Sequence, residues 1–167
     1  VERLLPLFDN GNDVGLITEA GLPAVADPGS QLVKLCHRHN IEVVPCSGPS
    51  SLMLALMGSG LNGQSFAFLG YIPAKTDERR QALKSIEKHS ASAHQTKIMI
   101  ETPYRNDSLF ADILNVCQGS TELCVAADIT MPDAYIMTKT VAEWKRYVAG
   151  KEAIIGKRPC VFLILAH

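Results

Sequence analysis

The sequence predicts an α/β protein, because short apolar runs alternate with amphipathic helical patterns along its 167 residues. A loop rich in glycine and proline, residues 18–29, lies where an early apolar run gives way to a helical pattern. The composition, with 47% hydrophobic and 20% charged residues, is typical of a folded protein. These observations predict the remainder of one α/β unit followed by a second, mixed α/β unit.

The first 70 residues alternate between strand and helix patterns. Continuous apolar runs predict buried strands, and their order with the helices predicts a parallel βαβαβ arrangement. The second helix is apolar on every side, which predicts burial on several sides. The expected strands are Val14–Ile17, Ile41–Pro45 and Phe66–Leu69. The expected helices are a short one at Glu2–Phe8, one at Gln31–His39 and one from Ser50 to Met57.

A change in composition over Gly70–Thr76 predicts a boundary between domains at 1–70 and 71–167. The helix expected at 77–88 carries a run of charges, which we interpret as a solvated face. After it we expect strands at 97–101, 122–127, 134–138 and 159–165, helices at 106–118 and 141–148, and a loop or hairpin at 150–156.

The loop at residues 18–29 is the first candidate ligand site. Ligands of α/β sheets bind where strands end and helices begin. Gly21 and Gly29 allow a positive φ or close backbone approach, and Glu19 and Asp27 supply carboxylates. The alternative is an ordinary connecting loop in which Asp27 caps the following helix.

Composition narrows the classes of function. The net charge is −1, so no overall basic field indicates a nucleic-acid partner. No apolar run approaches the roughly 20 residues of a membrane-spanning helix. Five cysteines without a C-x-x-C pair indicate neither a disulfide framework nor a zinc site. A reducing cytoplasm is the simplest compartment.

Five segments, in the right order, resemble motifs of the tetrapyrrole methylase superfamily, and within it the branch typified by ribosomal RNA small subunit methyltransferase I. The first, Thr18–Gly29, resembles S-D-A-G-x-P-x-x-x-D-P-G, and Glu101–Arg105 resembles E-S-P-H-R. The other three are residues 48–51, 58–61 and 66–80, and the similarity fades after Arg105, where Asp128–Thr130 resembles R-E-L-T.

The resemblance implies a class III methyltransferase-like fold, in which two α/β domains have the cofactor cleft between them. The family's first strand and its loop have no counterpart here, and the chain opens at Val1 in a helical pattern. We therefore expect the first domain to be incomplete in this chain.

The resemblance also implies S-adenosyl-L-methionine as cofactor. A sulfonium cation and an amino group favour a nearby carboxylate or hydroxyl, and adenine favours apolar walls. Glu19 and Thr18 replace the family's Asp and Ser. The implied cofactor-binding residues are Thr18, Glu19, Ala20, Gly21, Val25, Ser50, Ser51 and Ile100.

Glu101 and Arg105 are the candidate catalytic residues, as a base and a cation beside a ribose hydroxyl. Arg105 alternatively holds a phosphate or propionate, or forms an ordinary salt bridge to Glu101 or Asp107. The histidines do not converge in sequence. Trp144 and Tyr147 lie three residues apart on a helix, which favours core or interface packing.

The resulting expectation is a cytoplasmic, homodimeric S-adenosylmethionine-dependent methyltransferase that modifies a ribosomal RNA ribose at its 2′ oxygen. The alternatives are a porphyrin or corrin C-methyltransferase and a non-catalytic homologue that binds the cofactor or a partner. The neutral charge and Tyr104, which replaces the family's His, weigh against the RNA substrate. No metal is expected.

Overall fold

The computed structural model describes residues 1–151 and 155–167. The chain forms two compact units, Val1–Ser50 and Ser51–His167. The division into domains 1–70 and 71–167 stays a prediction. None of the helices in the described part of the chain has the length and apolar character that a membrane crossing requires.

The first unit contains a 3-10 helix, η1 (Glu2–Gly11), and an α-helix, α1 (Ser30–Arg38). The strands predicted at Val14–Ile17 and Ile41–Pro45 are wrong, because no strand forms within residues 1–50 of the described chain. A buried strand needs a hydrogen-bonded neighbour and covered faces. Instead, Ile17 is 88% exposed and Val44 is 70% exposed.

Helix α1 agrees with the predicted helix to within one residue at each end. Asn40 follows it with φ 55°, the left-handed conformation typical of a helix C-terminus. The alternative in which Asp27 caps this helix is wrong, since the N-cap residue is Gly29 and no side chain caps the helix.

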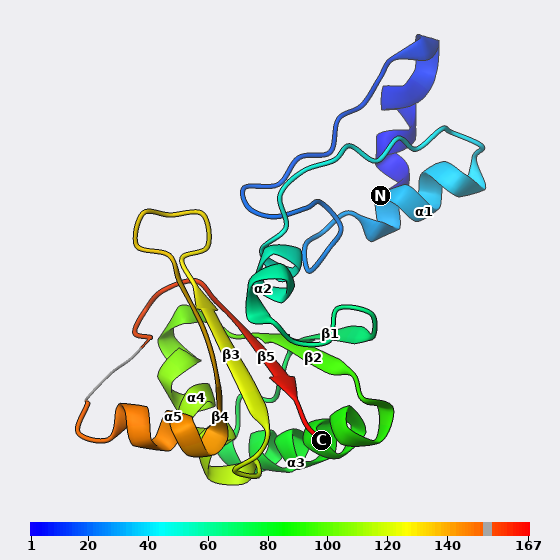
Figure 1. Cartoon of the computed structure of the whole chain (residues 1–167). Helices are drawn as coiled ribbons and strands as arrows, with labels where there is room; N and C mark the ends of the chain where they lie inside the picture. The colour runs from blue at the N-terminus through cyan, green and yellow to red at the C-terminus, as the bar shows by residue number, and fades with distance from the viewer. Residues whose placement is uncertain (152–154) are drawn as a thin grey trace. The chain divides into compact units, whose positions relative to one another are not determined.

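The second unit is built on a five-stranded mixed sheet in the order β1-β2-β5-β3-β4 (Figure 1). The pair β1–β2 is parallel, and the other three pairs in the described sheet are antiparallel. The strands are β1 (Phe66–Tyr71), β2 (Thr96–Ile100), β3 (Glu122–Ala127), β4 (Tyr135–Thr140) and β5 (Cys160–Leu165).

Strand β1 corrects the predicted parallel βαβαβ arrangement of the first 70 residues. It pairs with β2 in the second unit, and α3 (Thr76–Ala93) connects the two strands as a β-α-β crossover. The register shifts between Phe68 and Tyr71, where Gly70 has φ 70°. This irregularity is a bulge at the edge of the sheet.

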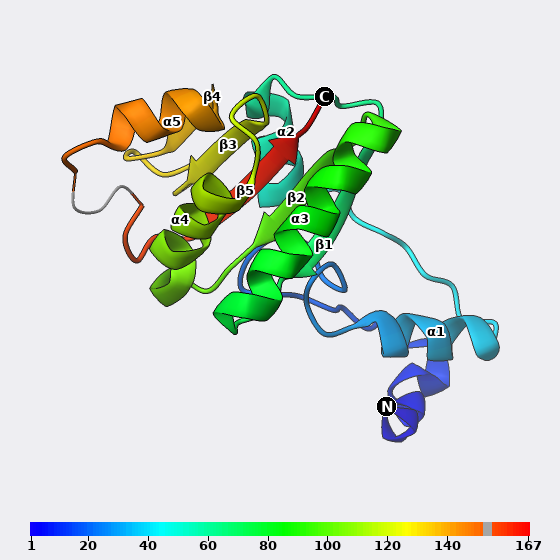
Figure 2. The same cartoon turned by 90° about the horizontal axis from the view of Figure 1, so that it is seen from below.

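Helices cover both faces of the sheet. Helices α3, α4 (Asn106–Val116) and α5 (Val141–Val148) lie on one face, and α2 (Ser51–Ser59) lies on the other (Figure 2). Alternate strand residues supply the two cores, so that Val125 and Phe162 pack toward α3–α5 and Cys124 and Leu163 toward α2.

Helix α2 is buried on one side, not on several as predicted. Leu52, Ala55 and Leu56 are buried, whereas Met57 is 79% exposed. The sheet provides a single apolar surface for this helix, and the residues on its other side therefore have no core to enter.

Helix α3 has the predicted solvated face, with Arg80, Lys84 and Lys88 exposed, but two of its charged residues are buried. Arg79 and Glu87 are buried on the same side as Leu83, at intervals of four residues. Arg79 Nε and Arg80 Nε each donate to Asp112 of α4 at 2.7 Å. These charges enter the interior because partners on α4 and on the loop after it satisfy them.

The remaining elements follow the sequence closely. Strand β3 and helix α5 have the predicted bounds, and α4 and β5 differ from the prediction by one or two residues at an end. Trp144 is fully buried, as its predicted packing role requires, and its Nε1 donates to the Leu123 carbonyl at 2.8 Å. The loop predicted at 150–156 lies partly outside the described residues.

Candidate functional site

The second candidate loop begins where β2 ends. Ile100 is the last residue of the strand, and Glu101 and Thr102 lead into a 3-10 turn, η2 (Pro103–Arg105). Thr102 is extended, as a residue before proline prefers, and Pro103 opens the turn. The turn brings Arg105 back to Glu101, and α4 starts at the next residue.

Glu101 is a buried carboxylate with one engaged and one free oxygen. Its side chain has no exposed surface. Oε1 accepts a hydrogen bond from the Thr102 amide at 2.6 Å and one from Arg105 Nη2 at 2.7 Å. Oε2 is buried and has no hydrogen-bond partner among the described residues.

Burial raises the pKa of Glu101, but hydrogen bonds from Arg105 and Thr102 and the charge of Arg105 outweigh burial. The pKa of Glu101 is therefore below its ordinary value. The hydrogen bond and the charge of Glu101 in turn raise the pKa of Arg105. Both groups are charged at neutral pH, so Oε2 is a hydrogen-bond acceptor.

Arg105 forms the ion pair with Glu101 that was one of the predicted alternatives, and Asp107 is occupied elsewhere. Arg105 Nε is also buried without a partner in the described chain, although 41% of the side chain is exposed. A buried polar atom left unpaired costs about 1–3 kcal/mol. The unpaired acceptor and the unpaired donor of this ion pair both lie below the surface, so a ligand reaches them only when the turn opens.

A second layer of contacts fixes this loop to the segment before β5. Asn106 is fully buried, and its Nδ2 donates to the carbonyl oxygens of Arg158 at 2.6 Å and Gly156 at 3.3 Å. Asp107 Oδ1 accepts from the amides of Ile155 and Gly156, both at 3.3 Å. Sequence reasoning missed Asn106 as a structural residue, because its partners lie about fifty positions away.

Strands β2 and β3 both pair antiparallel with β5, so their carboxyl ends lie at the same edge of the sheet. Asp128 follows β3 with φ 50°, and its Oδ2 is 3.7 Å from Arg158 Nε. Tyr104 is 79% exposed, and Lys157 Nζ is 5.2 Å from the centre of its ring. This edge therefore combines a buried carboxylate with cations and an exposed aromatic ring.

The first candidate loop, residues 18–29, is a series of tight turns in the first unit. Thr18 Oγ1 donates to the Ala20 carbonyl at 3.2 Å, and Gly21 has φ 72°. Glu19 is exposed and Val25 is 46% exposed. Thr18, Glu19, Ala20, Gly21 and Val25 thus lie in one loop, whose predicted positive φ at Gly21 and Gly29 is confirmed.

Two non-glycine residues of this loop, Ala24 and Ala26, also have positive φ values, 63° and 55°. Such conformations cost about 1–3 kcal/mol each and cluster at ligand sites. Ser50 ends the first unit and Ser51 starts α2 in the second. Ile100, Glu101 and Arg105 lie together in the second unit.

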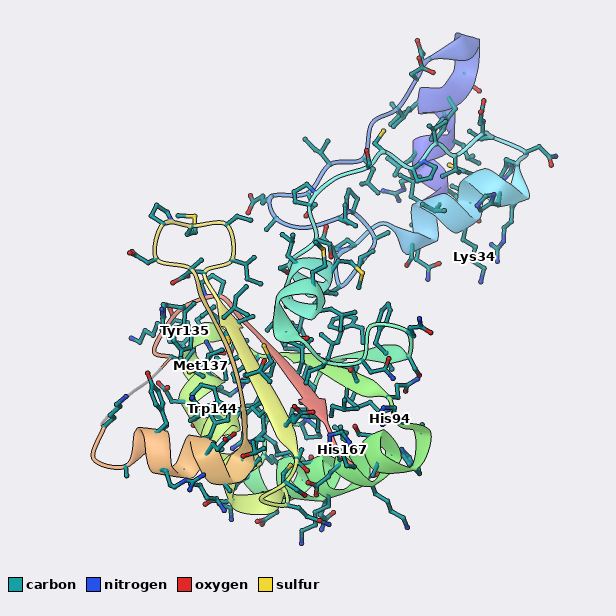
Figure 3. The ribbon with its side chains drawn as sticks, in the orientation of Figure 1. Lys34, His94, Tyr135, Met137, Trp144 and His167 are labelled. Atoms are coloured by element: carbon teal, nitrogen blue, oxygen red, sulfur yellow. The ribbon has the colours of Figure 1, made fainter. Side chains whose placement is uncertain are left out.

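Among the described residues, no group of three His, Cys, Asp or Glu side chains is arranged to hold a metal ion. His94 and His167 approach each other, with ring centres 5.7 Å apart, near the C-terminal end of α3 (Figure 3). They belong to the opposite end of the sheet from Glu101.

The architecture has a counterpart among solved methyltransferases. The structure of the methyltransferase CobJ matches with a TM-score of 0.54 and 16% identity, covering 87% of this chain and 62% of that chain. The fold is that of the class III methyltransferases, as predicted.

Residues 1–145 match the family Tetrapyrrole (Corrin/Porphyrin) Methylases, and the chain belongs to this family. It is 35% identical over 167 residues to Ribosomal RNA small subunit methyltransferase I of Vibrio cholerae, covering 100% of this chain and 54% of the relative. The protein of the same name from Thermotoga maritima is 36% identical over 130 residues, 78% of this chain and 56% of the relative. The chain spans about half the length of the curated relatives it matches.

Proposed function

We propose that the protein is an S-adenosyl-L-methionine-dependent methyltransferase that methylates the 2′-hydroxyl of a ribose in small-subunit ribosomal RNA. The observation that carries the proposal is the unpaired, buried Oε2 of Glu101 at the carboxyl end of β2. Relatives at 35% and 36% identity bear the name Ribosomal RNA small subunit methyltransferase I, which supports the choice of substrate.

The residues of the two loops suit the cofactor. Glu19 and the Thr18 hydroxyl match its positive sulfur and amino group, and Val25 and Ile100 offer apolar contacts for adenine. Ala20, Gly21, Ser50 and Ser51 complete the proposed set with small side chains and backbone groups. When bound, the cofactor supplies an electrophilic methyl group.

Glu101 and Arg105 are the proposed catalytic pair. When substrate binding opens the turn, Glu101 Oε2 accepts a hydrogen bond from the ribose hydroxyl and orients its oxygen for attack, and it takes up the proton as the oxygen loses it. Arg105 holds the carboxylate in place through Oε1 and keeps a donor, Nε, for the substrate. Positioning in a site poor in water supplies most of the acceleration.

A tetrapyrrole acceptor is the second candidate. The net charge of −1 does not favour a polyanion over the whole surface, and the planar fork of Arg105 also fits a propionate. A carbon nucleophile on the macrocycle needs less help from Glu101 than a ribose hydroxyl does. The two substrates therefore differ in how strongly they depend on this carboxylate.

Two measurements test the proposal. Calorimetry with S-adenosylmethionine tests the cofactor, and an absence of heat at saturating ligand would instead indicate the non-catalytic homologue. Primer extension across small-subunit ribosomal RNA, from a strain without the gene and from one complemented with it, tests the substrate. An RNA substrate is supported if a methylation stop disappears in the strain without the gene and returns in the complemented strain. An unchanged pattern of stops rejects it.

The proposal includes a homodimer in the cytoplasm and the domain division at residue 70. Met53 and Met57 on the outer side of α2 are 39% and 79% exposed, which suits an apolar contact between two copies. Light scattering after size exclusion distinguishes a dimer from a monomer. The variant Met57→Glu is expected to shift a dimer toward monomers.

A further inference from the structure

A groove lined by both apolar and charged residues runs along α3, outside the Glu101 loop. It consists of two adjoining cavities of about 590 and 530 Å³ that share Lys84. The first cavity lies between α3, the loop from α4 to β3, and the residues that follow β5, and the second lies between α3 and the end of α4. We call this surface the α3 groove.

The exposed charges of the α3 groove are positive. Arg80, Lys84 and Lys88 line it at intervals of four residues and lie on the exposed side of the helix. Residues four apart on a helix are about 6 Å apart along its axis. This spacing resembles that of consecutive phosphates along an extended nucleic-acid strand.

Two carboxylates near this row are buried, and a third, Glu122, lies 3.0 Å from His167 at the end of the groove. Glu87 is buried, and its Oε1 accepts hydrogen bonds from the Gln118 amide and the Thr121 hydroxyl. Asp112 is buried between Arg79 and Arg80. Lys84 and Lys88 are exposed to solvent, whereas the carboxylates of Glu87 and Asp112 lie below the surface.

The course of α3 relates the groove to the candidate site. Helix α3 starts after β1 and runs back to the start of β2. Because β1 and β2 are parallel, the start of α3 lies toward the carboxyl edge, where Glu101 follows β2. The groove thus extends from Arg80 on that side to Lys88 and His167 at the opposite edge.

We propose that the α3 groove binds the phosphodiester backbone of the RNA substrate, several nucleotides from the ribose that is methylated. This inference rests on the proposed function. A small tetrapyrrole does not need a row of cations that extends along a helix, whereas a polynucleotide does. Lys84 and Lys88 each contact a phosphate and displace counterions from it.

The test is fluorescence anisotropy with a short labelled single-stranded RNA cut from small-subunit ribosomal RNA, over a range of salt concentrations. The variant is Lys84→Ala/Lys88→Ala, and the control of equal charge is Lys145→Ala/Arg146→Ala on the exposed side of α5. Two lost phosphate contacts reduce the slope of log affinity against log salt by about 1.4 and weaken binding roughly tenfold or more at ~0.1 M salt. The control keeps the wild-type slope.

The outcomes separate the two proposals. Equal slopes for the groove variant and the wild type overturn the proposal that the α3 groove binds RNA. They leave the proposal that RNA is the substrate unaffected. No RNA binding by the wild type overturns both. Thermal melting of each variant shows whether a change in affinity reflects a change in folding, and Lys84→Arg/Lys88→Arg is expected to retain the wild-type slope.

Discussion

Arg105 donates from Nη2 to Oε1 of Glu101 at 2.7 Å, four residues back across a 3-10 turn, and leaves Oε2 of the carboxylate unpaired and buried. The pair thus holds a charged acceptor in a fixed position at a strand end. Four predictions follow from this and other contacts.

A substitution of Glu101 tests the proposed catalytic role of its unpaired oxygen. The variant Glu101→Gln keeps the shape of the side chain but removes its charge, and we expect methyl transfer to fall by about 10²–10⁴-fold, the usual effect of a positioned base. Transfer of a radiolabelled methyl group to ribosomal RNA measures it. The matched control, Glu78→Gln, changes a carboxylate whose side chain is 58% exposed, and activity is expected to stay. Equal activity of the two variants contradicts the role of Glu101.

Asp112 contributes stability that depends on pH. Burial raises its pKa, but hydrogen bonds from Arg80 and Arg79 outweigh burial, so the folded-state pKa lies below the ordinary 3.8. The stabilisation is therefore complete above about pH 3.8 and is lost as the pH falls through the lower folded value.

We expect Asp112→Asn to reduce the free energy of unfolding by about 3–5 kcal/mol at neutral pH, since Arg79 is then buried without its partner. The difference from the wild type shrinks below pH 3.8. Urea unfolding at several pH values measures both effects. Asp133→Asn, at an exposed position, is the control and should follow the wild-type curve. A constant difference at all pH values would argue against the ion pair as its cause.

Gly29 and Gly21, both in the first unit and both with positive φ, allow two alanine variants to be compared. At Gly29, φ is 145° and a Cβ atom would lie 2.6 Å from Leu16 Cδ2 and 3.2 Å from Ala24 Cβ. At Gly21, φ is 72° and a Cβ atom would meet nothing within 4 Å. Both alanine variants carry backbone strain of about 1–3 kcal/mol.

Because Gly29→Ala adds a steric clash to that strain, it is expected to lower the protection of α1 amides against hydrogen exchange more than Gly21→Ala does. Equal exchange in the two variants contradicts the packing of Gly29 against Leu16 and Ala24.

The cysteines should differ sharply in reactivity. Burial raises the pKa of Cys117 and Cys160 to about 12, and Cys36 and Cys124 are buried, whereas Cys46 is exposed. A thiol reagent at pH 8 is expected to modify one thiol per native chain and all five after denaturation. Cys46→Ser should abolish the native reaction. A second reactive thiol in that variant would disagree with the buried positions.

The sequence predicted the second unit well because its local patterns agree with its tertiary contacts. The apolar residues of β3 and β5 lie in the interior of the sheet, and α5 has a capping box in which Thr140 and Glu143 bond to each other's backbone amides. Local signals of this kind fix both the type and the ends of an element.

The first unit and α3 show where sequence reasoning is insufficient. Val14–Ile17 has the composition of a buried strand, but composition does not reveal whether a hydrogen-bonded neighbour exists. Arg79 looks like its solvated neighbours, because its partner Asp112 is 33 residues away. At the candidate site, the motif indicated Glu101 and Arg105, but the unpaired Oε2 depends on three-dimensional packing.

The irregularity at Gly70 has a consequence for how the molecule behaves at high concentration. Strand β1 is an outermost strand, and Phe66, Leu69 and Tyr71 on it are between 38% and 60% exposed. A straight strand of this composition offers a template onto which other chains add and polymerise. The bulge interrupts the row of amides and carbonyls after three residues, and so limits fibril-like growth along that side.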